Sequence, residues 1–275
     1  MDINGKVAVV TGGASGIGRA LCLALAERGA GAVVVADVDG GGAAQTVAAI
    51  EAAGHSALGV PADMSKEDDV KALVARAEDA FGRIDLFCSN AGIIVDGGVE
   101  VADAAWSRIW AINVQSHVFA ARALLPGMLA RGEGYLVITA SAAGLLTELG
   151  SAPYSVTKHA AVGLAEWLSI TYGDQGLRVS CLCPQAVRTN LTATSHREVS
   201  EMPAERTGLG TPQASMDGVL TAEDVAACVL EAIGDERFLI LPHPEVAMYE
   251  QRRAGDRDRW LRGMRRLQAR LGGPG

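Results

Sequence analysis

Short apolar runs alternate with longer segments of helical periodicity along most of the chain. Strands are expected at 6–12, 32–37, 56–63, 84–92, 134–141, 177–184 and 237–242, and helices at 18–30, 43–54, 65–82, 103–129 and from Tyr154 onward. A strand–helix–strand order places successive strands parallel in one sheet with helices on both faces. The pattern therefore predicts a single α/β domain over residues 1–275, with a doubly wound parallel sheet of about seven strands.

Two local signals predict where individual helices begin and end. Gly29 follows a helical run and is a plausible C-terminal stop. Ser65 stands three residues before Asp68, which resembles a capping box with Asp in place of Glu.

Two segments interrupt the alternation. Residues 189–218 mix Thr, Ser, Pro and Gly with scattered charges, and a loop of this length is usually functional, so we expect it to form the substrate region. Residues 246–271 predict one C-terminal amphipathic helix, because Trp260, Met264, Leu267 and Leu271 fall on one stripe. Eight arginines lie between 252 and 270. We favour the interpretation that the helix packs on the protein with its arginines facing solvent. The alternative is that the arginines bind an acidic surface.

Composition excludes several classes of partner. The net charge is −8, which argues against nucleic acid. No stretch of about 18 apolar residues is free of charge, so no membrane span is expected, and the N-terminus has no secretory pattern. The histidines form no ligand pattern, so no metal is expected. The five cysteines have no disulfide or CxxC spacing and predict free thiols in a reducing cytoplasm: Cys22, Cys88, Cys181, Cys183 and Cys228.

A glycine-rich loop, "VTGGASGIGRA", follows the first strand and opens the first helix. Gly12, Gly16 and Gly18 allow a tight turn and close approach of a pyrophosphate, whose charge the helix N-terminus favours. Such a loop alone could be a mere turn. Asp37 adds a second signal, because it ends the second strand 19 positions past Gly18. An acid there can accept hydrogen bonds from an adenosine ribose and would repel a 2′-phosphate, which favours NAD over NADP.

Tyr154 and Lys158 are four residues apart in "YSVTK" and share one face of the predicted helix. By spacing alone they are either a solvated pair at a helix start or a phenol whose pKa a neighbouring ammonium tunes for proton transfer.

These motifs together resemble the short-chain dehydrogenases/reductases. The resemblance covers about residues 4–190 and depends on five marks in order at the family's spacing. They are "TGGASGIG" at 11–18, "NAG" at 90–92, Asn113 in "AINV", Ser141 in "ITAS" and "YSVTK" at 154–158, with Tyr154 13 residues after Ser141. The resemblance implies a Rossmann-type fold and NAD-dependent transfer of a hydride.

The resemblance also implies roles for four catalytic residues. Tyr154 would be the general acid/base, and Lys158 would lower its pKa and hold the nicotinamide ribose. Ser141 would hold the substrate oxygen, and Asn113 would position a water for proton exchange. Asn113 could instead cap or kink its helix.

A cofactor shell is implied by the same register. Asp63 would contact adenine, Asn90 to Gly92 would lie beneath the adenosine ribose, and Val187 with Thr189 would grip the carboxamide. The full set expected at the cofactor is Gly12, Ser15, Gly16, Ile17, Gly18, Asp37, Asp63, Met64, Asn90, Ala91, Gly92, Tyr154, Lys158, Pro184, Val187 and Thr189.

The sequence departs from the family pattern at two positions. Ser89 replaces the first Asn of NNAG, where we expect a minor effect. Gln185 follows Pro184 where the family has glycine, and it could read a polar group of the substrate. The residues expected at the substrate are Ile93, Ala143, Leu149 and Gln185.

The sequence therefore predicts an NAD-dependent oxidoreductase that acts on a partly apolar secondary alcohol or the matching ketone. The alternatives are an NADPH-dependent ketoreductase of the same fold and a non-catalytic dinucleotide-binding protein. The resemblance further implies a homotetramer, rather than a dimer, assembled through the helices at about 104–129 and 154–172.

Overall fold

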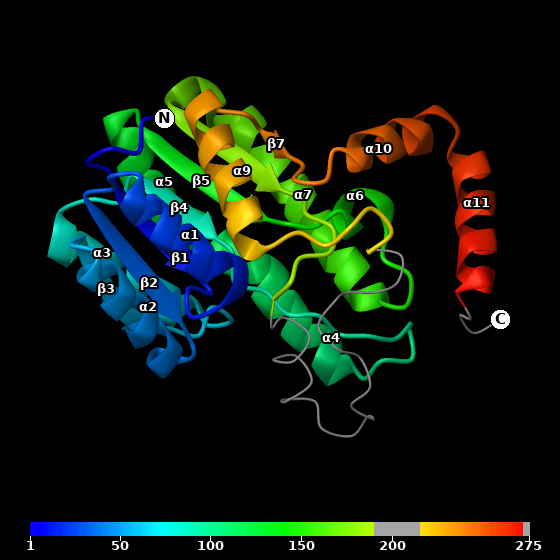
Figure 1. Cartoon of the computed structure of the whole chain (residues 1–275), viewed down its shortest axis with the longest axis horizontal. Helices are drawn as coiled ribbons and strands as arrows, with labels where there is room; N and C mark the ends of the chain where they lie inside the picture. Colours follow the sequence, from blue (N-terminus) through cyan, green and yellow to red (C-terminus); the bar gives the residue numbers. More distant parts are fainter. Residues whose placement is uncertain (190–214, 272–275) are drawn as a thin grey trace.

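A seven-stranded parallel sheet forms the centre of the molecule, in the order β3-β2-β1-β4-β5-β6-β7 (Figure 1). The computed structural model describes residues 1–189 and 215–271, so most of the expected loop at 189–218 lies outside the described residues. The order reverses direction between β1 and β4, as in a doubly wound fold, and confirms the predicted class. The strands are β1 (Val7–Thr11), β2 (Ala32–Asp37), β3 (Ala57–Pro61), β4 (Leu86–Ser89), β5 (Gly134–Thr139), β6 (Leu177–Leu182) and β7 (Leu239–Ile240).

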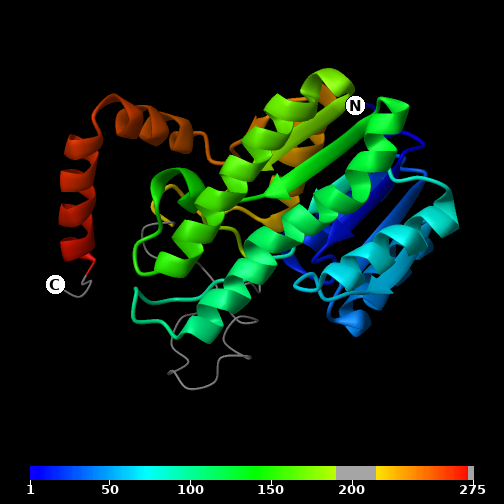
Figure 2. The same ribbon diagram turned by 180° about the vertical axis from the view of Figure 1, so that it is seen from behind.

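Helices cover both faces of the sheet. The helical elements are α1 (Gly16–Glu27), α2 (Gly40–Ala52), α3 (Glu67–Phe81), α4 (Asp103–Trp110), α5 (Ser116–Arg131), α6 (Ala143–Leu146), α7 (Ala152–Tyr172), α9 (Ala222–Asp235), α10 (Glu245–Gly255) and α11 (Arg257–Arg270), with a π turn η1 (Ala111–Gln115) and a 3-10 turn η2 (Gly173–Gln175). Helices α1, α2 and α9 form one core with the sheet, and α3, α5 and α7 form the other, as the opposite views of Figures 1 and 2 show.

Alternate residues of β1 supply the two cores. Val9 packs into the core beneath α3, α5 and α7, whereas Ala8 and Val10 pack into the core beneath α1, α2 and α9. Successive side chains of a strand point to opposite faces, so a strand covered on both sides must be apolar throughout. This is why "VAVVT" shows no alternation of polar and apolar residues.

The helix expected at 103–129 is interrupted. Helix α4 runs into the π turn η1, which contains Asn113, and α5 continues from Ser116. A single π turn inserted in an α-helix often marks a functional site.

The capping box expected at Ser65 and Asp68 is wrong. Helix α3 begins at Glu67, its N-cap Lys66 makes no side-chain cap, and the Ser65 hydroxyl donates instead to Asp63 Oδ1 at 2.7 Å. A Ser hydroxyl bonds a nearby acceptor as readily as a helix N-terminus, and here Asp63 lies closer.

The C-terminal segment forms two helices instead of the single one expected at 246–271. The chain breaks at Asp256, whose carboxylate accepts a hydrogen bond from the backbone N–H of Arg259 at 2.9 Å and so caps α11. Helix α10 packs on α6, while α11 packs chiefly on α10 among the described elements. Figures 1 and 2 show α11 standing apart from the sheet. We refer to residues 245–271 as the C-terminal arm.

None of the helices within residues 1–189 and 215–271 is long and apolar enough to cross a membrane. The same residues contain no group of His, Cys, Asp and Glu side chains placed to hold a metal ion.

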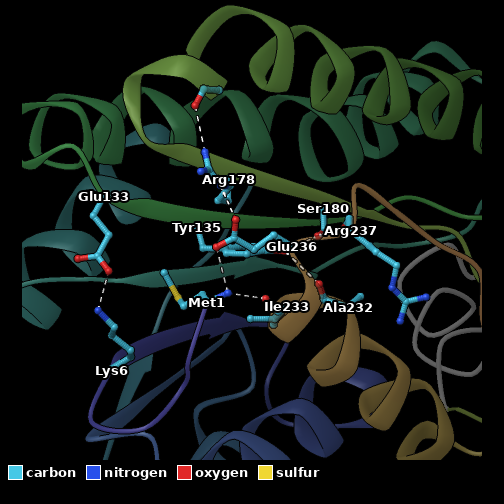
Figure 3. Close-up of polar contacts among 11 residues, drawn as sticks. Met1, Lys6, Glu133, Tyr135, Arg178, Ser180, Ala232, Ile233, Glu236 and Arg237 are labelled. Atoms are coloured by element: carbon cyan, nitrogen blue, oxygen red, sulfur yellow. Dashed lines mark hydrogen bonds and ion pairs between the residues drawn. The ribbon is translucent and has the colours of Figure 1, made fainter.

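Polar contacts join β5, β6 and the end of α9 near the amino ends of the strands (Figure 3). The buried Ser180 hydroxyl donates to the carbonyl of Arg237 at 2.5 Å, so the Tyr135 hydroxyl, 2.7 Å away, donates to Ser180 Oγ. Nearby, Glu236 pairs with Arg178 at 2.7 Å and with the Met1 ammonium at 3.2 Å. These contacts hold together the end of the sheet opposite the carboxyl ends of the strands.

We expect Tyr135→Phe to lower the free energy of unfolding by about 1 kcal/mol, because it removes a buried hydrogen bond without creating a large cavity. Urea denaturation at matched protein concentration measures the change. Tyr172→Phe is the control, since the Tyr172 hydroxyl has no hydrogen bond among the described residues. Equal stabilities of the two variants would contradict the role of this contact.

Candidate active site

A cavity of about 790 Å³ opens at the carboxyl ends of the central strands. In open parallel sheets, ligands bind at this edge, where the strand order reverses. The cavity extends from the glycine-rich loop after β1 to the C-terminal arm, and all sixteen residues expected at the cofactor line it. Of the four residues expected to be catalytic, Ser141, Tyr154 and Lys158 line the cavity, while Asn113 is buried.

The loop after β1 is shaped to receive a phosphate group. Gly12 and Gly16 have φ values of +69° and +51°, a conformation that side chains disfavour. A Cβ on Gly18 would lie 2.0 Å from the carbonyl oxygen of Gly12, so only glycine fits there. Ser15 is the N-cap residue of α1, and its side chain makes no cap. The helix N-terminus and its backbone N–H groups therefore face the cavity, which fits the pyrophosphate of a dinucleotide.

Asn90 joins the ends of three neighbouring strands beneath this loop. Its side chain donates to the carbonyl of Thr11 at 3.0 Å and accepts from the Thr139 hydroxyl at 3.1 Å. Thr11 in turn accepts the backbone N–H groups of Asn90 and Ala91 at 2.9 and 3.0 Å. The ends of β1, β4 and β5 are thus fixed relative to one another.

Asp37 and Asp63 line the end of the cavity nearest β2 and β3. Asp37 accepts from the backbone N–H groups of Ala14 and Asp39, each at 2.9 Å, so the carboxylate is tied to the glycine-rich loop. Partial burial disfavours the charge on Asp63, but hydrogen bonds from Ser65 and Lys66 outweigh it and lower the pKa of Asp63. Both carboxylates are therefore held as acceptors at the positions expected for ribose and adenine.

Lys158 lines the cavity beside Tyr154. Its Nζ atom donates to the carbonyl of Thr139 at 2.9 Å and lies 5.5 Å from the centroid of the Tyr154 ring. The Ser141 hydroxyl lies close enough to the Tyr154 phenol to influence its pKa, and its Oγ atom accepts the backbone N–H of Ala143 at 3.1 Å. Three groups able to exchange or hold protons thus meet at one point of the cavity.

Burial dominates the electrostatics of this set. It raises the pKa of Tyr154 to about 12 against the opposing effect of the nearby Ser141 hydroxyl. It lowers the pKa of Lys158 to about 8. The expected lowering of the phenol pKa by Lys158 is therefore not the net result, because desolvation of the phenolate is the largest effect and raises the pKa.

Asn113 connects the π turn to two other parts of the site. Its carbonyl oxygen accepts the backbone N–H of Ile93 at 2.9 Å, and its amide donates to the Ile93 carbonyl at 2.9 Å and to the Thr157 hydroxyl at 3.3 Å. Both amide N–H bonds are used by protein groups. The side chain thus positions the chain after β4 against the helix that carries Tyr154 and Lys158.

His117 was not expected from the sequence. Its Nδ1 atom lies 2.6 Å from the hydroxyl of Ser89, and its Nε2 atom is buried without a partner in the described part of the chain. Burial, aided by the nearby charge of Lys158, lowers the pKa of His117 to about 3, so the ring is neutral. The available signal was Ser89 itself, whose short side chain replaces the family's Asn and meets the ring.

The substrate side of the cavity is largely apolar. Ile93, Ala143 and Gln185 line it as expected, whereas Leu149 does not. The apolar stripe on α11 was expected to pack the helix, but Trp260, Met264 and Leu267 instead form part of the cavity wall. The residues that sequence reasoning missed include Ile112, Leu146, Met216, Tyr249, Arg108 and Arg252. These residues line the cavity because segments far apart in the sequence come together there, and no local sequence pattern predicts that.

Fold and site together define a dinucleotide-binding oxidoreductase built on a Rossmann-type sheet. A family model described as short chain dehydrogenase matches residues 6–200. The chain belongs to the short-chain dehydrogenase/reductase family.

Two relatives and one solved structure illustrate the similarity. A 1-deoxy-11-beta-hydroxypentalenate dehydrogenase of Streptomyces exfoliatus is 36% identical over 250 residues, covering 89% of this chain and 86% of that protein. A cis-4-hydroxycyclohexanecarboxylate dehydrogenase of Sinomonas cyclohexanicum is 37% identical over 234 residues, covering 83% and 93%. A short-chain dehydrogenase/reductase from Burkholderia phymatum in complex with NAD has a TM-score of 0.84 and 36% identity, covering 94% and 96%.

The pKa values in the site predict the pH dependence of alcohol oxidation. With Tyr154 as the base, oxidation needs the unprotonated phenol. A raised pKa keeps Tyr154 protonated at neutral pH, so kcat/KM should increase as pH rises from 6 to 8. Above about 8 the charge on Lys158 is lost and no longer favours phenolate, so the increase per pH unit should shrink. Steady-state rates at saturating cofactor measure the profile. A kcat/KM for oxidation that falls between pH 6 and 8 would contradict it.

Proposed function

We propose that the protein is an NAD-dependent dehydrogenase of a partly apolar secondary alcohol, with Tyr154 as the general acid/base. The observation that carries the proposal is the placement of Ser141, Tyr154 and Lys158 in the same cavity as the glycine-rich loop and Asp37. An alcohol at Tyr154 and a dinucleotide along the loop would then meet in one cavity.

The chain's own residues supply binding and proton transfer. A bound nicotinamide would supply the acceptor or donor of hydride. Ser141 can donate to the substrate oxygen, because its hydroxyl reaches only a long contact, 3.4 Å, with the carbonyl of Pro184. Tyr154 takes the alcohol proton in oxidation and returns it in ketone reduction. Lys158 is held by Thr139, and its charge favours the phenolate while the proton is away.

The apolar lining supports the proposed character of the substrate. Ile93 comes from the chain after β4, Ile112 from the π turn and Leu146 from α6, and α11 adds Trp260 and Met264 to the same cavity. The two relatives are named as dehydrogenases of hydroxylated carbon skeletons. Cyclohexanol and cis-4-hydroxycyclohexanecarboxylate are therefore the first alcohols for a screen that follows NADH absorbance.

Tyr154→Phe tests the catalytic assignment. We expect turnover to fall by about 10²- to 10⁴-fold, because the variant cannot exchange the alcohol proton, while NADH binding, followed by its fluorescence, is retained. Tyr172→Phe, outside the cavity, should keep wild-type activity. Retention of more than a tenth of the rate by Tyr154→Phe would reject Tyr154 as the acid/base. A wild type that binds NADH but oxidises no alcohol would favour the non-catalytic alternative.

Asp37 carries the proposed choice of NAD over NADP. A carboxylate at the ribose repels a 2′-phosphate, so we expect kcat/KM to favour NAD by about two orders of magnitude, and Asp37→Ser to narrow that ratio. Asp174→Ser, an exposed substitution remote from the cavity, should leave the ratio unchanged. A preference of the wild type for NADP would overturn the assignment and favour the ketoreductase alternative.

A homotetrameric assembly in the cytoplasm completes the proposal. Exposed apolar side chains on α7, namely Val156, Trp167 and Ile170, support an interface through that helix. Assembly there would also steady the helix that carries Tyr154 and Lys158. The five cysteines are all unpaired, which suits a reducing compartment.

A further inference from the structure

Gln185 stands next to the residue that contacts Ser141. The carbonyl oxygen of Pro184 accepts from the backbone N–H of Ala142 at 2.9 Å and from the Ser141 hydroxyl at 3.4 Å. Gln185 is the next residue along the chain and lines the same cavity. Its side chain therefore starts one residue away from a contact of the group proposed to hold the reacting oxygen.

The backbone of Gln185 is fixed from the other side as well. Its N–H donates to Nδ1 of His243 at 3.2 Å, and the following carbonyl, of Ala186, accepts from Leu220 at 3.1 Å. His243 is only 2% exposed, and burial lowers its pKa, which keeps the ring neutral and Nδ1 available as an acceptor. With the main chain held at both sides, the side chain of Gln185 is the free part of this segment.

The amide of Gln185 has no hydrogen-bond partner among the described residues. Its Oε1 atom is buried and unpartnered. Its Nε2 atom makes no hydrogen bond to the described protein and is not buried in the same way, so it remains open to the cavity. Because no described protein group accepts from Nε2, its N–H groups are available as donors to an oxygen of a ligand in the cavity.

We propose that Gln185 is a substrate-binding residue that donates a hydrogen bond to a second oxygen of the alcohol, close to the carbinol carbon. The substrate class is then a vicinally oxygenated secondary alcohol, such as a diol, a hydroxy ether or a hydroxy ketone. Glycine at this position, as in the family pattern, cannot make that contact. The inference depends on the proposed function, because it concerns the alcohol bound at Ser141 and Tyr154.

Two alcohols of equal size distinguish the effect of the second oxygen from the effect of substituent size. Trans-2-methoxycyclohexanol carries an acceptor oxygen where trans-2-ethylcyclohexanol carries a methylene. The Kd of each alcohol for the enzyme–NADH complex is measured by NADH fluorescence, for the wild type and for Gln185→Leu. We expect the Kd ratio, ethyl over methoxy, to fall about fivefold in the variant, which corresponds to one neutral hydrogen bond. Gln185→Glu, which keeps the size but lacks the donor, should lower the ratio similarly.

Gln45→Leu is the matched control, because Gln45 is an exposed residue of α2 outside the cavity, and it should keep the wild-type ratio. An unchanged ratio in Gln185→Leu, or no detectable binding of the methoxy alcohol, would overturn the proposal. A Gln185→Leu variant that binds NADH more weakly while the Kd ratio stays constant would also overturn the proposal, because Gln185 would then contact the cofactor. These are binding measurements, so a failure of the proposed function shows separately, as a wild type that binds the alcohols without oxidising them.

Discussion

The side chain of Asn90 connects the two chemical ends of the cavity. It binds Thr11 at the end of β1 and Thr139 at the end of β5, and the carbonyl of Thr139 in turn holds the Lys158 ammonium. The glycine-rich loop begins directly after Thr11. A short series of hydrogen bonds thus fixes the glycine-rich loop relative to Lys158. The proposed hydride transfer requires this relation to be accurate.

Burial disfavours the charged forms of the side chains around Tyr154. Tyr154, Lys158 and His117 all lie where water is largely excluded. Burial therefore raises the pKa of Tyr154 and lowers the pKa values of Lys158 and His117, which favours the neutral form of each side chain. A neutral phenol can donate a proton in ketone reduction. Removal of that proton to form the phenolate is favoured by a positive charge nearby. Because Lys158 is held by a carbonyl and not by a carboxylate, its charge remains available to the phenolate.

Local patterns predicted the fold well. Buried parallel strands are continuous apolar runs, so β1, β2 and β5 were readable from a few residues each, whereas most of the residues proposed to bind the cofactor were assigned through the family resemblance. The π turn at Asn113, the break at Asp256 and the true start of α3 depend on competition among nearby hydrogen-bonding groups, which residue preferences do not resolve. The cavity wall formed by α11 joins segments far apart in the chain, so no local signal predicted it. For the Ser89–His117 contact, the departure from the family pattern at Ser89 was the one available signal.

The parts of the cavity wall differ in how much they contribute to the stability of the fold. Ala143 packs with Tyr154 in a buried cluster, so a change there alters both the cavity and the packing of the catalytic tyrosine. Helix α11 has no fully buried residue and packs chiefly on α10, yet Trp260, Met264 and Leu267 shape the cavity. Substitutions on this face change which molecules fit while subtracting little from the cooperative unfolding free energy of the sheet. Met264 and Leu267 of α11 are therefore positions in the cavity wall where mutation can explore new substrates at low risk to folding, unlike Val246 of α10, which is buried in the core.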